Sequence, residues 1–226
     1  MLVVSSPAAT TALTTRDRFK AAANITTTTD DDFIDTQIIS ISDQINTILG
    51  VAAATDGTRT IGRETLVETI RSDQNDRYGS RCVIHQGYVA LIPSRFPVVS
   101  ITSITEDGVA VDAADYELDG VSGLIRRLSS DDPVDWSAGK IVITYVAGWL
   151  LPNDTGRNLP YDLEDAAISM IRASRFSRDR DPALKSESFV QRLYEYELFA
   201  GAATTGGSVP PDAMAALNRY RNIHFG

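Results

Sequence analysis

The sequence predicts an α+β fold, in which a helical core carries an inserted antiparallel β module and extended N- and C-terminal arms. Three observations support this class. Isoleucines recur at helical spacing in residues 34–48, β-branched runs fill the middle of the chain, and helical patterns return after residue 159. A short helix is marginal in water on its own, so the isoleucine stripe needs a partner helix. Packing it on the helix that follows the strands makes the β module an insertion.

The N-terminal part is predicted to hold an arm and two helices. Residues 1–13 are mostly small and polar, and such an arm is mobile unless a partner holds it. Residues 14–17 can cap a short helix that runs to about residue 23. The second helix opens at 30–32 and ends at Gly50, a residue type common just past a helix C-terminus. Its apolar stripe is Ile34, Ile38, Ile41, Ile45 and Ile48.

Asp30, Asp31 and Asp32 stand at the start of this second helix. Acidic side chains there accept hydrogen bonds from free N–H groups and complement the helix dipole, so we expect them to cap the helix. A metal site is the alternative. We favour capping because three adjacent carboxylates diverge around a helix axis and cannot all reach one cation.

The β module is predicted to cover residues 64–149, after a glycine-bearing linker at 51–63. Its first strands are expected at 65–70 and 81–92, and Asp107-Gly108 marks a tight turn further on. The remaining strands are expected at 98–104, 109–111, 116–118, 124–128 and 140–146. The last of these is the strongest, because its side chains are almost all β-branched or aromatic.

Helices return after the module. Pro160 suits the first turn of a helix, and a further helix candidate covers residues 188–199. A small-residue spacer at 201–208 leads to residues 210–212, which begin a last short helix. The resulting division is an N-terminal arm at 1–13, a discontinuous helical core at 14–63 and 150–200, the β module at 64–149, and a C-terminal arm at 201–226.

Composition excludes several classes of protein. The chain has 226 residues, 43% of them hydrophobic and 23% charged, which is typical of a globular chain. The net charge of −9 argues against wrapping nucleic acid through a broad basic face. No apolar run approaches the roughly 18 residues that span a bilayer, and the N-terminus lacks the basic start of a signal peptide. We therefore expect a cytoplasmic or particle context and no membrane partner.

No sequence pattern points to catalysis or to a cofactor. His85 and His224 lie far apart in the sequence, and no metal pair or charge-relay pair is visible. The single cysteine, Cys82, is expected to act as a small buried hydrophobe. Gly-rich phosphate loops, a nucleophile elbow and zinc-ligand spacing are missing too. We therefore predict a protein that is not an enzyme, with no catalytic, cofactor-binding or metal-binding residues.

Two other classes stay open. One is a small-molecule-processing enzyme, because a β module on helices can host a pocket. The other is a DNA- or carbohydrate-binding module with a β-sheet site, in which Trp136, Trp149 or the tyrosines would serve as stacking platforms. Arg172, Arg175 and Arg178 form an arginine run that would suit a DNA-contacting edge. We favour a solvated or interface face for the arginines, and packing in the core or at a hinge for Trp149.

The order of these features resembles the bacteriophage head–tail connector family, also called adaptor or head-completion proteins, of long-tailed phages. The matching segments are 30–34, 95–104, 107–108, 115–118, 139–149, 159–166, 181–188, 209–212 and 220–221. Each segment is weakly specific alone, and their order along residues 14–222 is the specific signal. The long N-terminal arm and the segment 189–199 depart from the family's pattern.

This resemblance implies a non-enzymatic virion protein of the particle neck, assembled in the host cytoplasm. Such proteins form a ring, usually of twelve copies, that docks under the portal and continues the DNA channel. The ring also offers a surface to the next neck or tail component, and DNA passes it without sequence-specific binding. The portal or the adjacent subunit is then the expected partner of the C-terminal arm. The contact residues predicted there are Met214, Leu217, Tyr220 and Arg221.

Replacing Ile38 or Ile41 by Asp is expected to prevent folding. Each change puts an unpaired charge into the apolar stripe, at a cost of several kcal/mol. Expression level and the circular dichroism spectrum of each variant are the measurements. Normal expression and a native spectrum for both variants would show that the stripe is not buried in the subunit.

Overall fold

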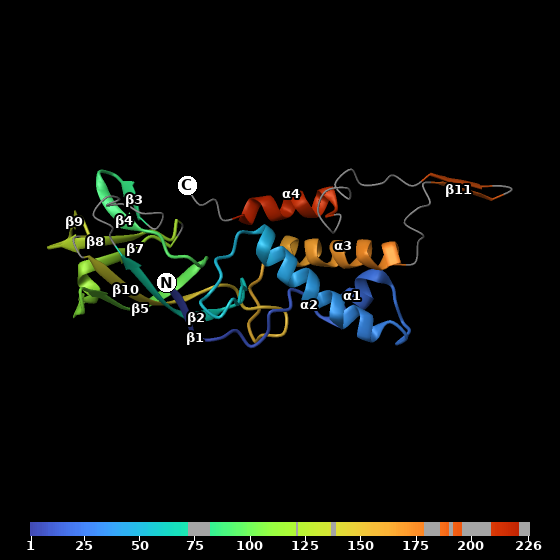
Figure 1. Cartoon of the computed structure of the whole chain (residues 1–226), viewed down its shortest axis with the longest axis horizontal. Coiled ribbons are helices and arrows are strands. Elements are labelled where there is room, and N and C mark those ends of the chain that lie inside the picture. Colours follow the sequence, from blue (N-terminus) through green and yellow to red (C-terminus); the bar gives the residue numbers. More distant parts are fainter. Residues whose placement is uncertain are drawn as a thin grey trace. The chain divides into compact units, whose positions relative to one another are not determined.

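A computed structural model describes residues 1–71, 82–120, 122–136, 139–178, 186–189, 192–195 and 209–221. Its helices and antiparallel sheets confirm the predicted α+β class (Figure 1). Contacts divide the chain into a β unit, which contains Met1–Thr11 and Gly50–Asn158, and a helical unit, which contains Ala12–Leu49 and Leu159–Arg221. The finer division into arms, core and module stays a prediction.

The first sheet of the β unit is built around one central strand. In spatial order its strands are β1 (Leu2–Ser6), β2 (Glu64–Arg71), β10 (Lys140–Ala147), β5 (Val98–Glu106) and β6 (Val109–Ala110), all antiparallel. As its composition predicts, β10 alternates: Ile141, Ile143 and Tyr145 are buried, and the residues between them are partly exposed. This alternation fixes which face of the sheet covers the core.

The second sheet adds its apolar side chains to the same core. Its strands are β3 (Cys82–His85), β4 (Tyr88–Leu91), β8 (Ile125–Ser129) and β7 (Tyr116–Leu118), with β9 (Asp132–Val134) paired to β8. Leu91 and Ile125 are fully buried and belong to one hydrophobic cluster with Leu66 and Ile143 of the first sheet. The β unit is therefore held together by two sheets around one core.

Two predictions for the β unit need correction. The expected strand at 81–92 is a hairpin, because Gln86 and Gly87 take positive φ angles of 55° and 90° and turn the chain back. The expected arm at 1–13 contains a strand, since β1 pairs with β2 and Leu2 is buried. Pairing with a strand some 60 residues later is a tertiary contact that local composition does not reveal.

The helical unit contains α1 (Arg16–Ala23), α2 (Asp31–Ile48), α3 (Tyr161–Arg178) and α4 (Pro211–Tyr220). Thr15 caps α1, because its hydroxyl accepts a hydrogen bond from the Arg18 N–H at 3.2 Å. The stripe on α2 is buried at Ile34, Ile38, Ile41 and Ile45. The helix packs on α3, as predicted from the stripe.

One helix prediction fails in this unit. The candidate at 188–199 is wrong where the structure describes it, because Ser186–Phe189 (β11) and Arg192–Glu195 (β12) form an antiparallel pair. Apolar residues in this stretch fit a helical spacing, yet so short a periodic run does not distinguish a helix from a strand.

Gly148 is required at the end of β10 for two physical reasons. Its φ angle is +98°, and its N–H donates to the Pro97 carbonyl at 2.9 Å. A Cβ at this position would lie 2.6 Å from the carbonyl carbon of Gly62 and 2.7 Å from the Ile61 oxygen. The backbone of the linker therefore approaches this glycine too closely for any side chain.

Gly148→Ala is expected to destabilise the protein more than Gly57→Ala, measured by urea unfolding. Gly57 has a similar φ of +86°, and a Cβ added there would have no atom within 4 Å, so its variant reports backbone strain alone. That strain is worth about 1–2 kcal/mol. Gly148→Ala adds a backbone clash, and equal losses in the two variants would contradict the close approach.

Candidate assembly interface

The four residues predicted to contact a partner lie on α4 or directly after it. Leu217 is fully buried (0% exposed) inside the helical unit itself, whereas Met214 and Tyr220 are half-buried and Arg221 is exposed. The helix thus already uses its apolar side on its own subunit. Partner contact through these four residues stays a prediction, and the side chain most available for it is Arg221.

Polar contacts fix how α4 lies on α3. The Tyr220 hydroxyl donates to the Asp162 carboxylate at 2.9 Å, and Arg219 Nη1 lies 3.6 Å from the same group. Near the other end of α4, the Ser169 hydroxyl donates to Asp212 Oδ2 at 3.4 Å. Burial and the bond to Asp162 raise the pKa of Tyr220 above its usual value. These contacts set both the direction and the register of α4.

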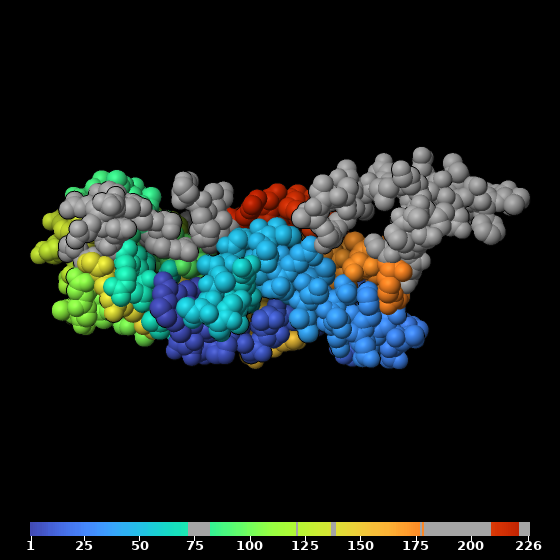
Figure 2. All heavy atoms as spheres, in the orientation of Figure 1, coloured from blue at the N-terminus to red at the C-terminus, as the bar shows by residue number. Residues whose placement is uncertain are grey.

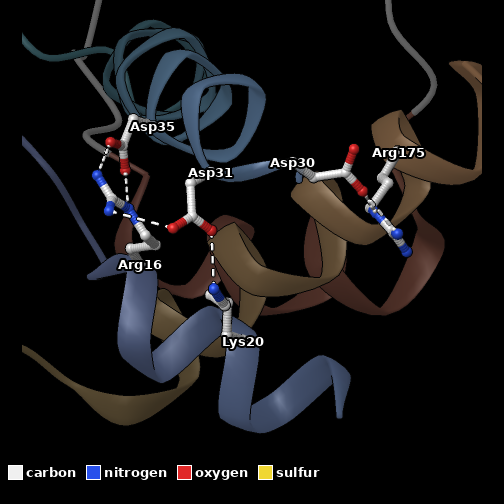
Figure 3. Close-up of polar contacts among 6 residues, drawn as sticks. All are labelled: Arg16, Lys20, Asp30, Asp31, Asp35 and Arg175. Atoms are coloured by element: carbon white, nitrogen blue, oxygen red, sulfur yellow. Dashed lines mark hydrogen bonds and ion pairs between the residues drawn. The ribbon is translucent and has the colours of Figure 1, made fainter. Parts of the chain in front are cut away.

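Asp30 does not cap α2 as the sequence suggested. The residue is the N-cap, but its side chain makes no capping bond. Its carboxylate instead accepts from Arg175 Nη2 at 2.8 Å and from Arg178 Nη2 at 3.1 Å (the Arg175 contact is drawn in Figure 3). Hydrogen bonds from Arg175 and Arg178 hold the pKa of Asp30 below its usual value. The start of α2 is therefore tied to the end of α3.

The neighbouring carboxylates tie α2 to α1. Asp31 Oδ1 lies 2.7 Å from Lys20 Nζ, and Asp35 Oδ1 accepts from Arg16 Nε at 2.8 Å (Figure 3). The bond from Arg16 lowers the pKa of Asp35. The acidic start of α2 thus faces cations of two different helices, and its carboxylates diverge as expected.

The arginine run of α3 is engaged inside the helical unit. Arg175 and Arg178 hold Asp30, and Arg178 also lies over the Phe33 ring at 4.2 Å from its centroid. Arg172 donates to the carbonyl oxygen of Ala22. A DNA-contacting edge would need these guanidinium groups turned toward phosphates, so the geometry argues against that reading of the run.

Glu164 is a buried anchor that the sequence analysis missed. It is fully buried on α3, where Arg18 Nε lies 2.5 Å away and the Thr14 hydroxyl donates at 3.1 Å. Removing either partner would leave a buried carboxylate undersatisfied, which makes this contact costly to break. It joins the segment before α1 to the first turn of α3.

The β unit holds a second buried polar group, centred on Glu68. Its carboxylate accepts from the Ser94 N–H at 2.8 Å and from the Tyr145 hydroxyl at 2.9 Å. Arg95, also buried, donates to the Thr58 carbonyl at 3.0 Å and lies 3.5 Å from Glu64. Positions 64, 66, 68 and 70 share the inward face of β2, so strand alternation was the available signal.

These groups have the character of structural anchors. Burial raises the pKa of Glu64, and the nearby Arg95 opposes that rise in part. Burial, reinforced by the Glu68 carboxylate, also raises the pKa of the Tyr145 hydroxyl. Together they fasten the connector before β5 and the linker before β2 to the sheet.

Neither tryptophan forms an open stacking platform in the β unit. Trp136 is buried, and its Nε1 donates to the Ile125 carbonyl at 3.2 Å. The Trp149 side chain belongs to a half-buried residue whose backbone N–H donates to the Ile61 carbonyl at 2.8 Å. Packing in the core or at a hinge, expected for Trp149, therefore fits that residue better than base or sugar stacking, and Trp136 is a core residue as well.

Exposed apolar side chains mark surfaces that another chain could cover. Among the described residues these are Met1, Ile39, Ile84, Tyr88, Val99, Val109, Tyr161 and Phe176. In the helical unit they are scattered. The neighbours of Ile39 on the same face of α2 include the exposed polar residues Thr36 and Asp43, and Figure 2 shows this helix with one side open to solvent. The exposed side of α2 is therefore not a continuous apolar face.

Neither a metal centre nor a membrane span is found in the part of the chain that the structure describes. No group of three or more His, Cys, Asp and Glu side chains is placed there to hold a metal ion. Within the same residues, every helix is too short or too polar to cross a membrane.

Asp30→Asn is expected to lower the melting temperature at neutral pH. A carboxyl whose folded pKa is depressed stabilises the protein above its unfolded value of 3.8 and loses that effect as the pH falls through the folded value. The deficit of the variant should therefore shrink in acid, below about pH 4. Melting curves across this range test the prediction, with Asp43→Asn, exposed on the same helix, as control. A deficit independent of pH would contradict the charge pairing.

Solved structures of GTA (gene transfer agent) particles contain the same fold. A chain in the neck of a native GTA particle, computed with C12 symmetry, matches with a TM-score of 0.53 at 17% sequence identity, over 99% of this chain and 96% of that chain. A chain in the neck of an empty GTA particle, computed with C6 symmetry, gives a TM-score of 0.55 at 15% identity over 99% and 96% of the two chains. No protein-family model and no curated protein sequence matches the chain. At these identities the likeness concerns the fold, and it extends over nearly the whole of both chains.

Proposed function

We propose that the chain is a structural subunit in the neck of a phage-like particle. Copies of it form a ring that docks on the portal, continues the DNA channel and joins the head to the next neck or tail component. The observation that carries the proposal is the fold shared with GTA neck chains over 99% of this chain. An adaptor role and assembly in the host cytoplasm are added by the connector-like order of sequence segments.

A ring of twelve copies is the proposed assembly. The neck of the native GTA particle was computed with C12 symmetry, and that of the empty particle with C6 symmetry. A ring of twelve identical copies is compatible with both symmetries. A cyclic ring uses one heterologous contact repeated around the axis, so each subunit needs two different surfaces for its neighbours. A modest contact then becomes strong because it is repeated.

The electrostatics of the chain suit a channel through which DNA slides. The net charge is −9, and the arginines at the end of α3 are paired with Asp30. A protein that neutralises few phosphates releases few counterions, so it gains little affinity for DNA. DNA would therefore pass without sequence-specific binding, and the role we propose requires no catalysis and no cofactor.

Portal contact is proposed for the C-terminal end of the chain. Arg221 is exposed directly after α4, and Met214 is half-buried on the same helix. Leu217 and Tyr220 would support the portal contact indirectly, because they hold α4 on α3. Leu217 is buried, and the Tyr220 hydroxyl binds Asp162. An exposed arginine suits a carboxylate on the partner through bidentate pairing.

The purified chain is expected to bind the portal ring of its particle, with twelve copies per ring counted by native mass spectrometry. Arg221→Ala should weaken this binding without changing the melting temperature, because the side chain is exposed. Ser40→Ala, exposed on α2, serves as the matched surface control. Absence of binding to the portal, combined with absence of the chain from purified particles, would overturn the proposed function.

A further inference from the structure

The contact between α4 and α3 is a self-contained docking unit. Ala213 and Leu217 supply the buried apolar side of α4, with 2% and 0% exposure. Asp162 and Ser169 on α3 bind Tyr220 and Asp212 of α4 at the two ends of the contact. Among the described elements, α4 makes its extensive contact with α3. The two polar groups named above that bind α4 therefore lie on a single helix.

The sequence connecting the two helices is long. Residues 179–210 separate α3 from α4, and β11 and β12 within this stretch pair as a hairpin. Even so, segments 179–185 and 196–210 together can extend to roughly 70 Å, at about 3.3 Å per residue. A unit of about 100 residues has a radius of gyration near 13 Å and is thus roughly 35 Å wide. The sequence between α3 and α4 is therefore long enough to reach past a neighbouring copy.

We propose that, in the assembled ring, α4 docks on α3 of the neighbouring copy instead of its own. The inference rests on the proposed function, since it needs a ring. The occupant proposed for the neighbour's α3 is a second copy of α4, which carries the same apolar side and the same polar anchors. Exchange of an identical element between copies keeps every contact and changes only which chain supplies it.

Exchange would explain how copies are joined without a large exposed apolar face among the described residues of the helical unit. Ile39, Tyr161 and Phe176 are scattered on that unit, whereas the apolar side of α4 is buried. In a free subunit α4 packs on α3 of the same chain, which keeps the apolar side of α4 covered from solvent before assembly. In the ring the neighbour's α3 is held close to α4, at a high effective concentration. The contact with the neighbour's α3 can therefore compete with the contact within one chain.

Cysteine cross-linking tests the exchange on the full-length chain. Cys82 is the single cysteine, so Cys82→Ala gives a thiol-free background. Ser169→Cys and Asp212→Cys then place thiols at two positions whose native side chains hydrogen-bond at 3.4 Å. One chain carries Ser169→Cys, and a second, longer by a tag, carries Asp212→Cys. The two are co-assembled on the portal ring and treated with a short bismaleimide, so a mixed cross-linked pair can form only between chains.

The expected result is a mixed cross-linked pair from assembled rings and none from the same mixture before assembly. A chain carrying both cysteines should give an intrachain product when free and a ladder of linked chains when assembled. Ser40→Cys in place of Asp212→Cys, exposed on α2, controls for random collision. Rings that give only the intrachain product would overturn the exchange and leave the proposed function standing. Failure of the chain to assemble on the portal at all would overturn both.

Discussion

The packing of α2 on α3 is the constraint on which the rest of the chain depends. These helices lie on either side of the long stretch between Ile48 and Tyr161, and their contact brings the two ends of that stretch to the same unit. The isoleucine face of α2 has no other large partner among the described helices, so α3 must return to cover it. The strands between them form their own core together with β1 from the start of the chain.

Buried and half-buried charges make this arrangement specific. Apolar packing alone tolerates sliding of one helix along another, but Asp30 with Arg175, and Glu164 with Arg18, each match at one register only. In the β unit, Glu68 plays the same part, because it joins Tyr145 of the central strand to the connector at Ser94. Glu164 and Glu68 are buried, so leaving either carboxylate unpaired is costly, and alternative packings are penalised.

The sequence predicted elements whose signal is local and missed contacts whose signal is distant. Periodicity revealed the stripe of α2, and β-branched composition revealed β10, because each pattern lies within a single element. The pairing of β1 with β2, and of Asp30 with Arg175, joins residues far apart in the sequence, which no local pattern reveals. Capping was a sound expectation for Asp30, but its carboxylate binds two arginines of α3 instead. For α4 the sequence suggested an apolar strip, and only the structure shows that Leu217 is covered within its own subunit.

A cryo-electron microscopy reconstruction of the particle neck tests most directly whether this chain is, as we propose, a ring-forming subunit there. We expect a ring of twelve copies at the portal, each with an α2–α3 pair and a two-sheet β unit that can be traced in the density. We also expect the ring to enclose the path of the DNA. Density at the neck that this fold does not fit, in particles from which the chain is absent, would contradict the claim.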